Sequence, residues 1–297
     1  MAPLDCSVVI VNYRTDELLA ECLASLDKEQ GVLALEVVVV DNSRTLAVGG
    51  FRERFPAVTL LENAENVGFA GAANQGIRLA RGRHVLVLNP DTAVHEGAVG
   101  TMIRYLDTHP AVGAVGARLL ESDGSLQYSC RRFPGYFTVF FGRYGVLTRI
   151  LPGNPASRDY LYLDWDHREV REVDWVSGAC LMVRRAVVER VGAFDEGYFL
   201  FVEDMDWCRR IRHAGWAVVY LPAAVVTHHI GVSRGAVPAW VVRARHRGML
   251  RYVRKHFGAP WPVRAGVAVA LTARTAALVA ANAVRRGRAG KTPPKTQ

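Results

Sequence analysis

The fold of this 297-residue chain is decided by Ser7-Val-Val-Ile-Val-Asn-Tyr13 and Leu35-Glu-Val-Val-Val-Val-Asp-Asn-Ser43. Both apolar runs are rich in β-branched residues and bounded by polar ones, a pattern typical of strands buried on both faces. Between them, residues 15–27 place their leucines on one face and predict a helix. The runs at 58–61 and 84–88 repeat the strand pattern. Continuous apolar strands that alternate with helices predict an α/β fold, with a mostly parallel central sheet flanked by helices.

Polar side chains follow these strands at the point where each strand ends. Ligands of open parallel sheets bind beyond the carboxyl ends of the strands, so this row predicts a nucleotide site. Asn and Asp also end strands for structural reasons, which explains single positions better than four strands in succession. The row consists of Asn12, Tyr13, Asp41, Asn42, Ser43, Glu62, Asn63, Asn89, Pro90 and Asp91.

Three acids lie close together in Tyr198-Phe-Leu-Phe-Val-Glu-Asp-Met-Asp-Trp-Cys-Arg-Arg210, directly after an aromatic run. Carboxylates beside apolar side chains are costly unless they are paired, bind a metal or act as bases. Asp206 and Arg210 have the i, i+4 spacing of a helical ion pair, so we expect them to be structural. Glu203 and Asp204 remain candidates for catalysis, although Asp204 could instead cap a helix.

A histidine pair ends a further apolar run, in Val225-Val-Thr-His-His-Ile-Gly-Val-Ser233. An acid and a histidine at strand ends, together with a candidate base, are the parts of a metal-assisted transferase. Considered alone, an aspartate placed like Asp91 is a turn residue about half the time. A histidine placed like His228 is more often structural than a metal ligand. The prediction of a metal-assisted transferase therefore rests on the order and context of the motifs taken together.

The second half of the chain is less regular. Residues 112–117 and 173–183 have strand character, and residues 186–191 predict a short helix. The segment 133–166 is rich in aromatic residues, Gly, Pro and Arg without a clean period, which predicts a long insertion or lid.

The charge of the chain is divided unevenly. From Trp207 onward there are 17 Lys and Arg residues and no acid, whereas the first 206 residues hold 20 basic and 28 acidic residues. Such a tail predicts an anionic partner, either nucleic acid or an acidic lipid surface, with a solvated basic face as the alternative. Residues 240–256 interleave arginine with aromatic and aliphatic residues, which suits an interfacial helix on anionic lipid. We therefore favour peripheral membrane contact.

The last part of the tail allows several interpretations. Residues 263–284 approach spanning length, but Arg274 would lie in mid-bilayer. A helix packed on the domain or in a homo-oligomer explains this segment as well as a membrane helix does. Residues 285–297 predict disorder.

Five scattered cysteines contain no C-x-x-C pair, so we expect a reducing compartment rather than a zinc ribbon or disulfide scaffold. The amino terminus lacks the basic region and the long apolar core of a secretory signal. These features predict a cytoplasmic protein.

Eight short motifs between about residues 7 and 233 occur in a recognisable order. They are Val9-Ile-Val-Asn-Tyr, Val40-Asp-Asn-Ser, Asn66-Val-Gly-Phe-Ala-Gly-Ala-Ala-Asn-Gln-Gly, Leu88-Asn-Pro-Asp, Trp175-Val-Ser-Gly-Ala, Gly192-Ala-Phe-Asp-Glu, Glu203-Asp-Met-Asp and His228-His-Ile-Gly-Val-Ser. With them the chain resembles the family 2 glycosyltransferases of the GT-A fold, and among these the bacterial rhamnosyltransferase-like group. The resemblance implies an inverting transferase that uses a nucleoside diphosphate sugar and a divalent cation, Mg²⁺ or Mn²⁺.

The resemblance also implies roles for single residues. Asp204, beside Glu203, matches the catalytic base of the family. Asp91 matches the last acid of the metal-binding D-x-D motif, and Asn89 replaces its first acid, so we expect Asn89 to contact ribose or metal-bound water. His228 matches the histidine that faces the metal and the diphosphate, with the adjacent His229 as a competitor for that role.

The remaining matches divide between the two substrates. Asp41 matches the acid that contacts the nucleotide base or ribose. The resemblance implies nucleotide-sugar binding by Asn12, Tyr13, Asp41, Asn42, Asn66, Gly68, Phe69, Asn74 and Asn89. It implies an acceptor-side wall of Trp175, Ser177 and Gly178, which could instead belong to the core.

The expected organisation is a GT-A catalytic domain at 1–235, with a nucleotide-sugar half at about 1–117 and an acceptor-side half at about 118–235. Residues 236–297 would form a basic helical C-terminal extension. The expected activity is transfer of a sugar, rhamnose by the subgroup's name, to a glycan or polyprenyl-linked acceptor in cell-surface polysaccharide assembly. The enzyme would work in the cytoplasm at the inner face of the plasma membrane.

Rival functions fit less well. A dehydrogenase should carry G-x-G-x-x-G after the first strand, where this chain has Asn12-Tyr-Arg-Thr-Asp, and a P-loop is also absent. A processive synthase is disfavoured because the sequence has no multi-helix membrane region and no Gln-x-x-Arg-Trp. A nucleotide- or nucleic-acid-binding protein without glycosyl transfer would leave the acids at the strand ends unexplained, so no nucleic-acid partner is expected.

Overall fold

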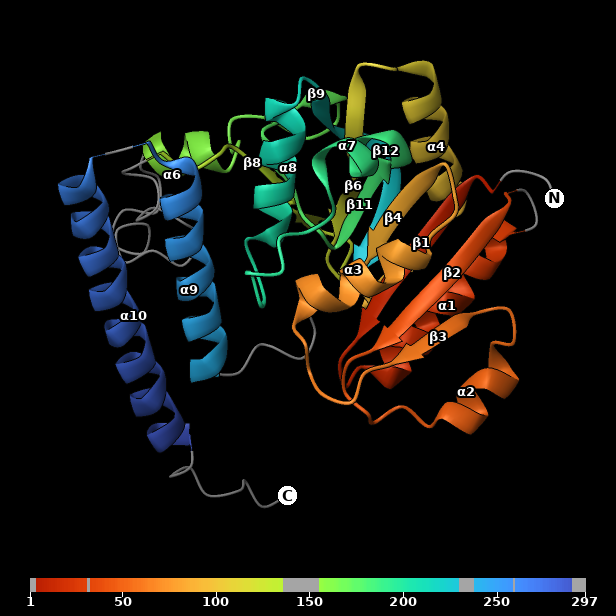
Figure 1. Ribbon diagram of the computed structural model, residues 1–297, viewed down its shortest axis with the longest axis horizontal. Helices are drawn as coiled ribbons and strands as arrows, with labels where there is room; N and C mark the ends of the chain where they lie inside the picture. The colour runs from red at the N-terminus through yellow and green to blue at the C-terminus, as the bar shows by residue number, and fades with distance from the viewer. Residues whose placement is uncertain (1–3, 31–32, 136–154, 230–237, 259, 290–297) are drawn as a thin grey trace.

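The computed structural model describes residues 4–30, 33–135, 155–229, 238–258 and 260–289, and a large β-sheet lies at its centre (Figure 1). The strands of this sheet lie in the spatial order β3–β2–β1–β4–β11–β6–β12–β5. Their bounds are β1 (Cys6–Asn12), β2 (Leu35–Asp41), β3 (Thr59–Glu62), β4 (His84–Leu88), β5 (Thr92–Val94), β6 (Val112–Leu120), β11 (Cys180–Arg184) and β12 (Ala217–His228). Short strands β7 (Leu126–Gln127) and β9 (Arg171–Glu172) pair with β6 and β12, and β8 (Cys130–Arg131) pairs with β10 (Trp175–Val176).

The first half of the sheet is parallel throughout. Strands β3, β2, β1 and β4 run in one direction, and β12 is parallel to β6. Strand β11 lies between β4 and β6 and runs antiparallel to both. The α/β expectation with a mostly parallel sheet is therefore confirmed.

Helices cover both faces of the sheet (Figure 1). Successive residues of β1 point to opposite faces: Val8 and Ile10 belong to one buried cluster, and Val9 and Val11 belong to the other. This alternation explains why the strand is apolar at consecutive positions. The helices described are α1 (Asp16–Gln30), α2 (Val48–Arg54), α3 (Phe69–Leu79), α4 (Ala98–Thr108), α6 (Pro155–Tyr160), α7 (Arg185–Val191), α8 (Glu203–His213), α9 (Ala239–His256) and α10 (Trp261–Ala289).

The two buried clusters assign each helix to a face. Helices α1 and α4 contribute their apolar residues to the same cluster as Val8, whereas α3, α7 and α8 contribute to the cluster of Val9. Helix α9 packs on that second side, and α10 lies beside α9 (Figure 1). The second side is the side on which the candidate site forms.

Several elements differ from the sequence expectations. The expected strand at 173–183 is split into β10 and β11, because the turn at 177–179 comes close to α8. Residues 285–289 continue α10 instead of being disordered, since adding turns to an existing helix costs little for Ala and Arg. Much of the expected insertion at 133–166 lies outside the described residues, and its described part contains α6.

Helix α9 is fastened to α8 around Asp206, which is fully buried. The carboxylate accepts hydrogen bonds from Arg210 Nε at 2.8 Å and from Lys255 Nζ at 3.1 Å, and His256 Nε2 lies 2.6 Å from it. Burial alone would raise the pKa of Asp206, but these hydrogen bonds hold it well below its usual range. The predicted Asp206–Arg210 pair is confirmed, and α9 adds Lys255 and His256 to it.

Candidate active site

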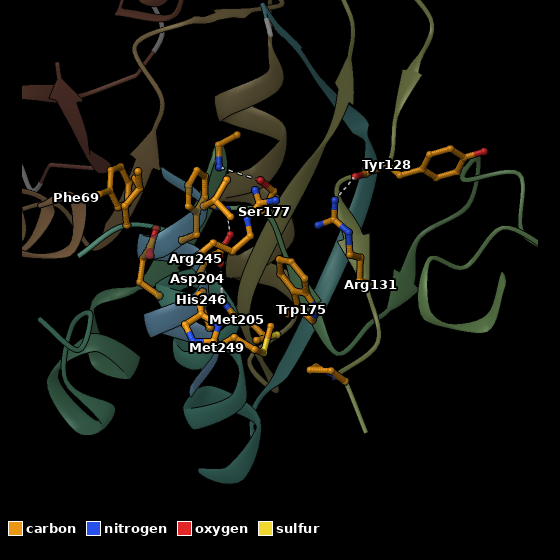
Figure 2. Close-up of a pocket in the computed structure, with 18 of the residues that line it drawn as sticks. Phe69, Tyr128, Arg131, Trp175, Ser177, Asp204, Met205, Arg245, His246 and Met249 are labelled. Atoms are coloured by element: carbon orange, nitrogen blue, oxygen red, sulfur yellow. Dashed lines mark hydrogen bonds between the residues drawn. The ribbon is translucent and has the colours of Figure 1, made fainter. Parts of the chain in front are cut away.

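A cavity of about 420 Å³ lies where the carboxyl ends of the central strands, α8, α9 and α10 approach one another (Figure 2). Residues from each of these regions line it. Eight residues that the sequence marks as candidates are among them: Phe69, Asn89, Trp175, Ser177, Gly178, Glu203, Asp204 and His228. The fold thus brings together candidates from both predicted halves of the catalytic domain.

The acidic pair begins helix α8. The two residues before it, Phe201 and Val202, have left-handed backbone angles, with φ of 67° and 77°. Such angles are strained for a β-branched residue, and strain of this kind is concentrated at functional sites. The sharp bend turns Glu203 and Asp204 from the preceding loop into the first turn of the helix.

Asp204 is held in place by the backbone around it. Its Oδ2 accepts a hydrogen bond from the Gly178 N–H at 2.9 Å, and its Oδ1 accepts one from the Met205 N–H at 2.8 Å. A Cβ at position 178 would lie 3.3 Å from the Cβ of Asp204, so the glycine permits this close approach. Gly178 therefore orients the carboxylate.

Burial affects the protonation of both acids. Burial and then the charge of Asp204 raise the pKa of Glu203 to about 8. Burial also raises the pKa of Asp204 above its usual range, although the N–H groups of Gly178 and Met205 act in the opposite direction. Like charges this close do not ionise together readily. At neutral pH the pair therefore carries at most one negative charge, which the two backbone donors favour on Asp204.

A second group of polar residues lies at the ends of β4 and β12. His228 Nε2 lies 3.2 Å from Asp91 Oδ1 and 3.3 Å from Asn89 Nδ2. On the other side of the ring, Nδ1 lies 2.7 Å from Gln127 Oε1, an oxygen that can only accept. This contact assigns the ring proton to Nδ1 and leaves the Nε2 lone pair directed toward Asp91. His229 points elsewhere: its Nδ1 lies 2.9 Å from Ser122 Oγ.

The described residues contain no cluster of three or more His, Cys, Asp or Glu side chains with metal-binding geometry. The available donors are one carboxylate, one imidazole nitrogen and the side chain of Asn89. This small set fits Mg²⁺ or Mn²⁺, because these ions commonly bind through one or two protein ligands together with substrate phosphate oxygens. Asp91 and His228 are the residues that would hold the ion.

The polar row at the ends of β1, β2 and β3 forms a connected network. Asn12 donates to Asp41 Oδ1 at 3.1 Å, and the Ser43 hydroxyl donates to the same oxygen at 2.6 Å. Asn42 donates to Asn66 Oδ1 at 2.8 Å and accepts from the Val67 N–H at 3.0 Å. These contacts join the strand ends to the loop before α3.

Gly68 and Phe69 connect this network to the acidic pair. Gly68 has φ of 81°, and a Cβ there would lie 2.6 Å from the carbonyl oxygen of Phe199. That oxygen also accepts a hydrogen bond from the Phe69 N–H at 2.8 Å. The loop that leads to Glu203 therefore rests directly on the start of α3.

Eight predicted site residues do not line the cavity, and two of them, Tyr13 and Asn74, also have none of the contacts described above; the other six are Asn12, Asp41, Asn42, Asn66, Gly68 and Asp91. Asn74 is buried, and hydrogen bonds join it to the backbone of Phe194 and to Glu196 Oε1. Tyr13 is 37% exposed and has the Arg14 guanidinium over its ring. Their roles in nucleotide-sugar binding stay predictions.

The cavity also contains residues that the sequence did not single out. Gln127 comes from a two-residue strand, too short for its alternation to be read from sequence. Arg131, Arg245 and Arg274 come from three separate elements. Only Arg245 and Arg274 had a signal in the sequence, since each lies at helical spacing from apolar residues of the same segment.

Comparison with known proteins places the chain among sugar transferases. Residues 3–250 match the model of the glycosyltransferase like family 2. The chain is 32% identical to an N-acetylglucosaminyl-diphospho-decaprenol L-rhamnosyltransferase of Mycobacterium tuberculosis, over 96% of this chain and 95% of the relative. It is 25% identical to the rhamnosyltransferase WbbL of Escherichia coli K12, over 75% of this chain and 82% of the relative.

Solved structures agree on the fold. A mannosyltransferase from Pyrobaculum calidifontis, in complex with GDP-Man and Mn²⁺, matches 96% of this chain and 76% of its own with a TM-score of 0.58 at 19% identity. Staphylococcus aureus TarS 1–349, in complex with UDP-GlcNAc, matches 91% of this chain and 72% of its own with a TM-score of 0.54 at 15% identity. The GT-A fold expected from the motifs is confirmed by these similarities.

Proposed function

The chain belongs to the family 2 glycosyltransferases, and from this membership we propose that it transfers a sugar from a nucleoside diphosphate donor to a hydroxyl of a lipid-linked glycan, with inversion at the anomeric carbon. The geometry of Asp204 carries the proposal. Its carboxylate is fixed by two backbone N–H groups inside the cavity, beside a second acid whose pKa is raised to about 8. A purely nucleotide-binding protein has no need of such a pair.

In the proposed reaction, Asp204 accepts the proton of the attacking acceptor hydroxyl. The new bond forms between that oxygen and the anomeric carbon while the bond from the anomeric carbon to the diphosphate breaks, and the nucleoside diphosphate leaves with the electron pair. Burial raises the pKa of Asp204, which makes it a stronger base than an exposed aspartate. Glu203 stays protonated and so adds no second charge beside the base.

Asp91 and His228 would hold the Mg²⁺ or Mn²⁺ ion. When bound, the ion neutralises the charge that develops on the departing diphosphate. Gln127 keeps the His228 proton on Nδ1, and Asn89 lies against the same imidazole. The network around Asp41 and Asn42 would contact the nucleoside, since it occupies the strand ends where nucleotides bind in such sheets.

The relatives favour one donor and one class of acceptor. Both named transferases are rhamnosyltransferases, and the Mycobacterium tuberculosis relative, named for a diphospho-decaprenol acceptor, matches almost end to end. We therefore propose rhamnose as the transferred sugar and a polyprenyl-diphosphate glycan as the acceptor. The same assignment favours work at the cytoplasmic face of the plasma membrane, where peripheral contact would bring the enzyme to its lipid-linked substrate.

The test is a transfer assay with a nucleoside diphosphate rhamnose, a synthetic N-acetylglucosaminyl-diphospho-prenol and Mn²⁺. We expect a rhamnosylated product whose anomeric configuration is opposite to that of the donor. Asp204→Asn should lower the transfer rate by about 10² to 10⁴-fold while leaving nucleotide binding unchanged. Retained configuration would contradict inversion, and full activity of Asp204→Asn would remove Asp204 as the base.

A further inference from the structure

The cavity has a wall that comes entirely from the two C-terminal helices. Helix α9 contributes Val242, Arg245, His246 and Met249, and helix α10 contributes Leu271, Arg274, Thr275 and Leu278. Each set has the spacing i, i+3, i+4 and i+7, which is one continuous face of a helix. In both sets an arginine stands second, and apolar residues stand at the two ends. Two helices thus present matching faces to one cavity.

This wall gives the cavity an excess of positive charge. The lining residues include Arg131, Arg245 and Arg274, whereas its acids are Glu203 and Asp204, which together carry at most one negative charge at neutral pH. Burial, and next the charge of Arg245, lower the pKa of Arg274, so the two guanidinium groups lie close enough to repel one another. A dianionic ligand would relieve that repulsion.

The cationic wall lies on the side of the base. The charge of Arg245 acts on Glu203, and the charge of Arg131 acts on Asp204. Tyr160, a buried phenol in the same lining, lies within electrostatic reach of all four charged groups, Arg131, Asp204, Arg245 and Arg274. In Figure 2, Arg245, His246 and Met249 of α9 are drawn around Asp204.

This location argues against the donor diphosphate as the ligand. In a direct displacement, the attacking hydroxyl and the leaving diphosphate lie on opposite sides of the anomeric carbon. The donor diphosphate belongs with the Asp91–His228 group at the ends of β4 and β12, and the base side belongs to the acceptor. A diphosphate on the base side is therefore the diphosphate of the acceptor.

We propose that the α9–α10 wall binds the lipid diphosphate of the acceptor, with Arg245 and Arg274 on the diphosphate and Met249, Leu271 and Leu278 on the first prenyl units. The inference rests on the proposed function, because it assumes a prenyl-diphosphate acceptor. The inference adds to that function the site at which the diphosphate of the acceptor binds. Both halves of the ligand have a counterpart in the wall, since guanidinium groups pair with phosphate oxygens and apolar side chains cover the chain.

Calorimetric titration with farnesyl diphosphate tests the proposal, with farnesol and inorganic pyrophosphate as partial ligands. Wild-type protein should bind farnesyl diphosphate more tightly than either partial ligand. Arg274→Met and Arg245→Gln should each weaken binding at least about tenfold. Matched controls are Arg264→Met, on an exposed position of α10, and Arg243→Gln, on an exposed position of α9, which should bind as the wild type does.

The outcomes are distinct. Unchanged farnesyl diphosphate affinity in both cavity variants, each with a wild-type melting temperature, would overturn the proposal. So would loss of nucleotide–Mn²⁺ binding in Arg245→Gln, because the arginine would then serve the donor. If the variants lost retention on phosphatidylglycerol vesicles but kept farnesyl diphosphate affinity, the wall would contact membrane headgroups instead. Failure of the transferase assignment is recognised separately, by the absence of nucleotide-dependent sugar transfer in the wild type.

Discussion

At the scale of single residues, two adjacent buried acids differ in the backbone N–H groups that reach them. Glu203 and Asp204 are both buried at the start of α8, but only Asp204 accepts hydrogen bonds from the N–H groups of Gly178 and Met205. Such donors favour an ionised carboxylate, whereas a buried oxygen of Glu203, Oε2, has no hydrogen-bond partner in the structure. The two backbone amides thus distinguish Asp204, the proposed base, from Glu203.

The raised pKa of Glu203 predicts that the stability of the folded protein depends on pH. Its pKa is about 8 in the folded protein and 4.5 ordinarily, so between these values the folded state holds a proton that the unfolded state lacks. Stability contributed by Glu203 therefore falls as pH rises through this window, by up to about 1.4 kcal/mol per pH unit. Glu203→Gln should remove that part of the slope in urea unfolding series, and the exposed Glu189→Gln should keep it. Parallel slopes for wild type and Glu203→Gln would contradict a raised pKa.

The contact between Gln127 and His228 predicts that Gln127 affects metal binding, although Gln127 is not itself a proposed metal ligand. Gln127→Leu removes the acceptor that keeps the proton of His228 on Nδ1. Mn²⁺-dependent binding of a nucleoside diphosphate should weaken by about 10 to 100-fold, measured by fluorescence titration, while metal-free nucleotide binding stays the same. Gln127→Glu keeps an acceptor and should retain most of the affinity. Equal affinity in Gln127→Leu would show that the histidine needs no such partner.

At the scale of elements, the site depends on how α8 and α9 meet. Asp206 of α8 is fully buried against Arg210, Lys255 and His256, so it holds α9 beside the helix that carries the acidic pair. Because α9 also contributes Arg245 and Met249 to the cavity, this contact helps to hold part of the cavity lining in place. The contacts of Asp206 with α9 therefore affect the cavity, although Asp206 itself does not line it.

Asp206→Asn should destabilise the protein by about 3 kcal/mol, because it leaves Arg210 and Lys255 without the buried carboxylate that pairs with them. Urea unfolding gives this value directly. Asp164→Asn, which breaks a surface pair with Arg158, should cost less than about 1 kcal/mol. A loss as small for Asp206→Asn as for Asp164→Asn would mean that α9 is held chiefly by its apolar contacts.

At the scale of the whole molecule, helix α10 both lines the cavity and carries exposed apolar residues. Within the described residues, one helical segment, Trp261–Val279, is long and apolar enough to span a membrane, and most of it is exposed. Trp261 is 73% exposed and Val269 is 69% exposed. Basic residues on α9 and an apolar outer face on α10 together suit a membrane surface.

Contact with anionic lipid predicts sedimentation with vesicles that contain phosphatidylglycerol and weaker sedimentation in high salt. Trp261→Ser should reduce the bound fraction several-fold, because an interfacial tryptophan contributes strongly to such binding. Val170→Ser, at another exposed apolar position, is the control and should have no effect. Equal sedimentation of Trp261→Ser and wild type would exclude the outer face of α10 as the contact.

The sequence by itself determined the mostly parallel sheet, the order of its first four strands along the chain and eight of the residues that line the cavity. Apolar runs, strand-end polar residues and short motifs are local, so periodicity and spacing reveal them. Only the tertiary structure decided that β11 enters the sheet antiparallel, that Gln127 orients His228 and that α9 and α10 close the cavity. These features are contacts between segments far apart in the sequence, as for Gln127 with His228 and Tyr160 with Arg274, and no local pattern specifies which distant side chains meet.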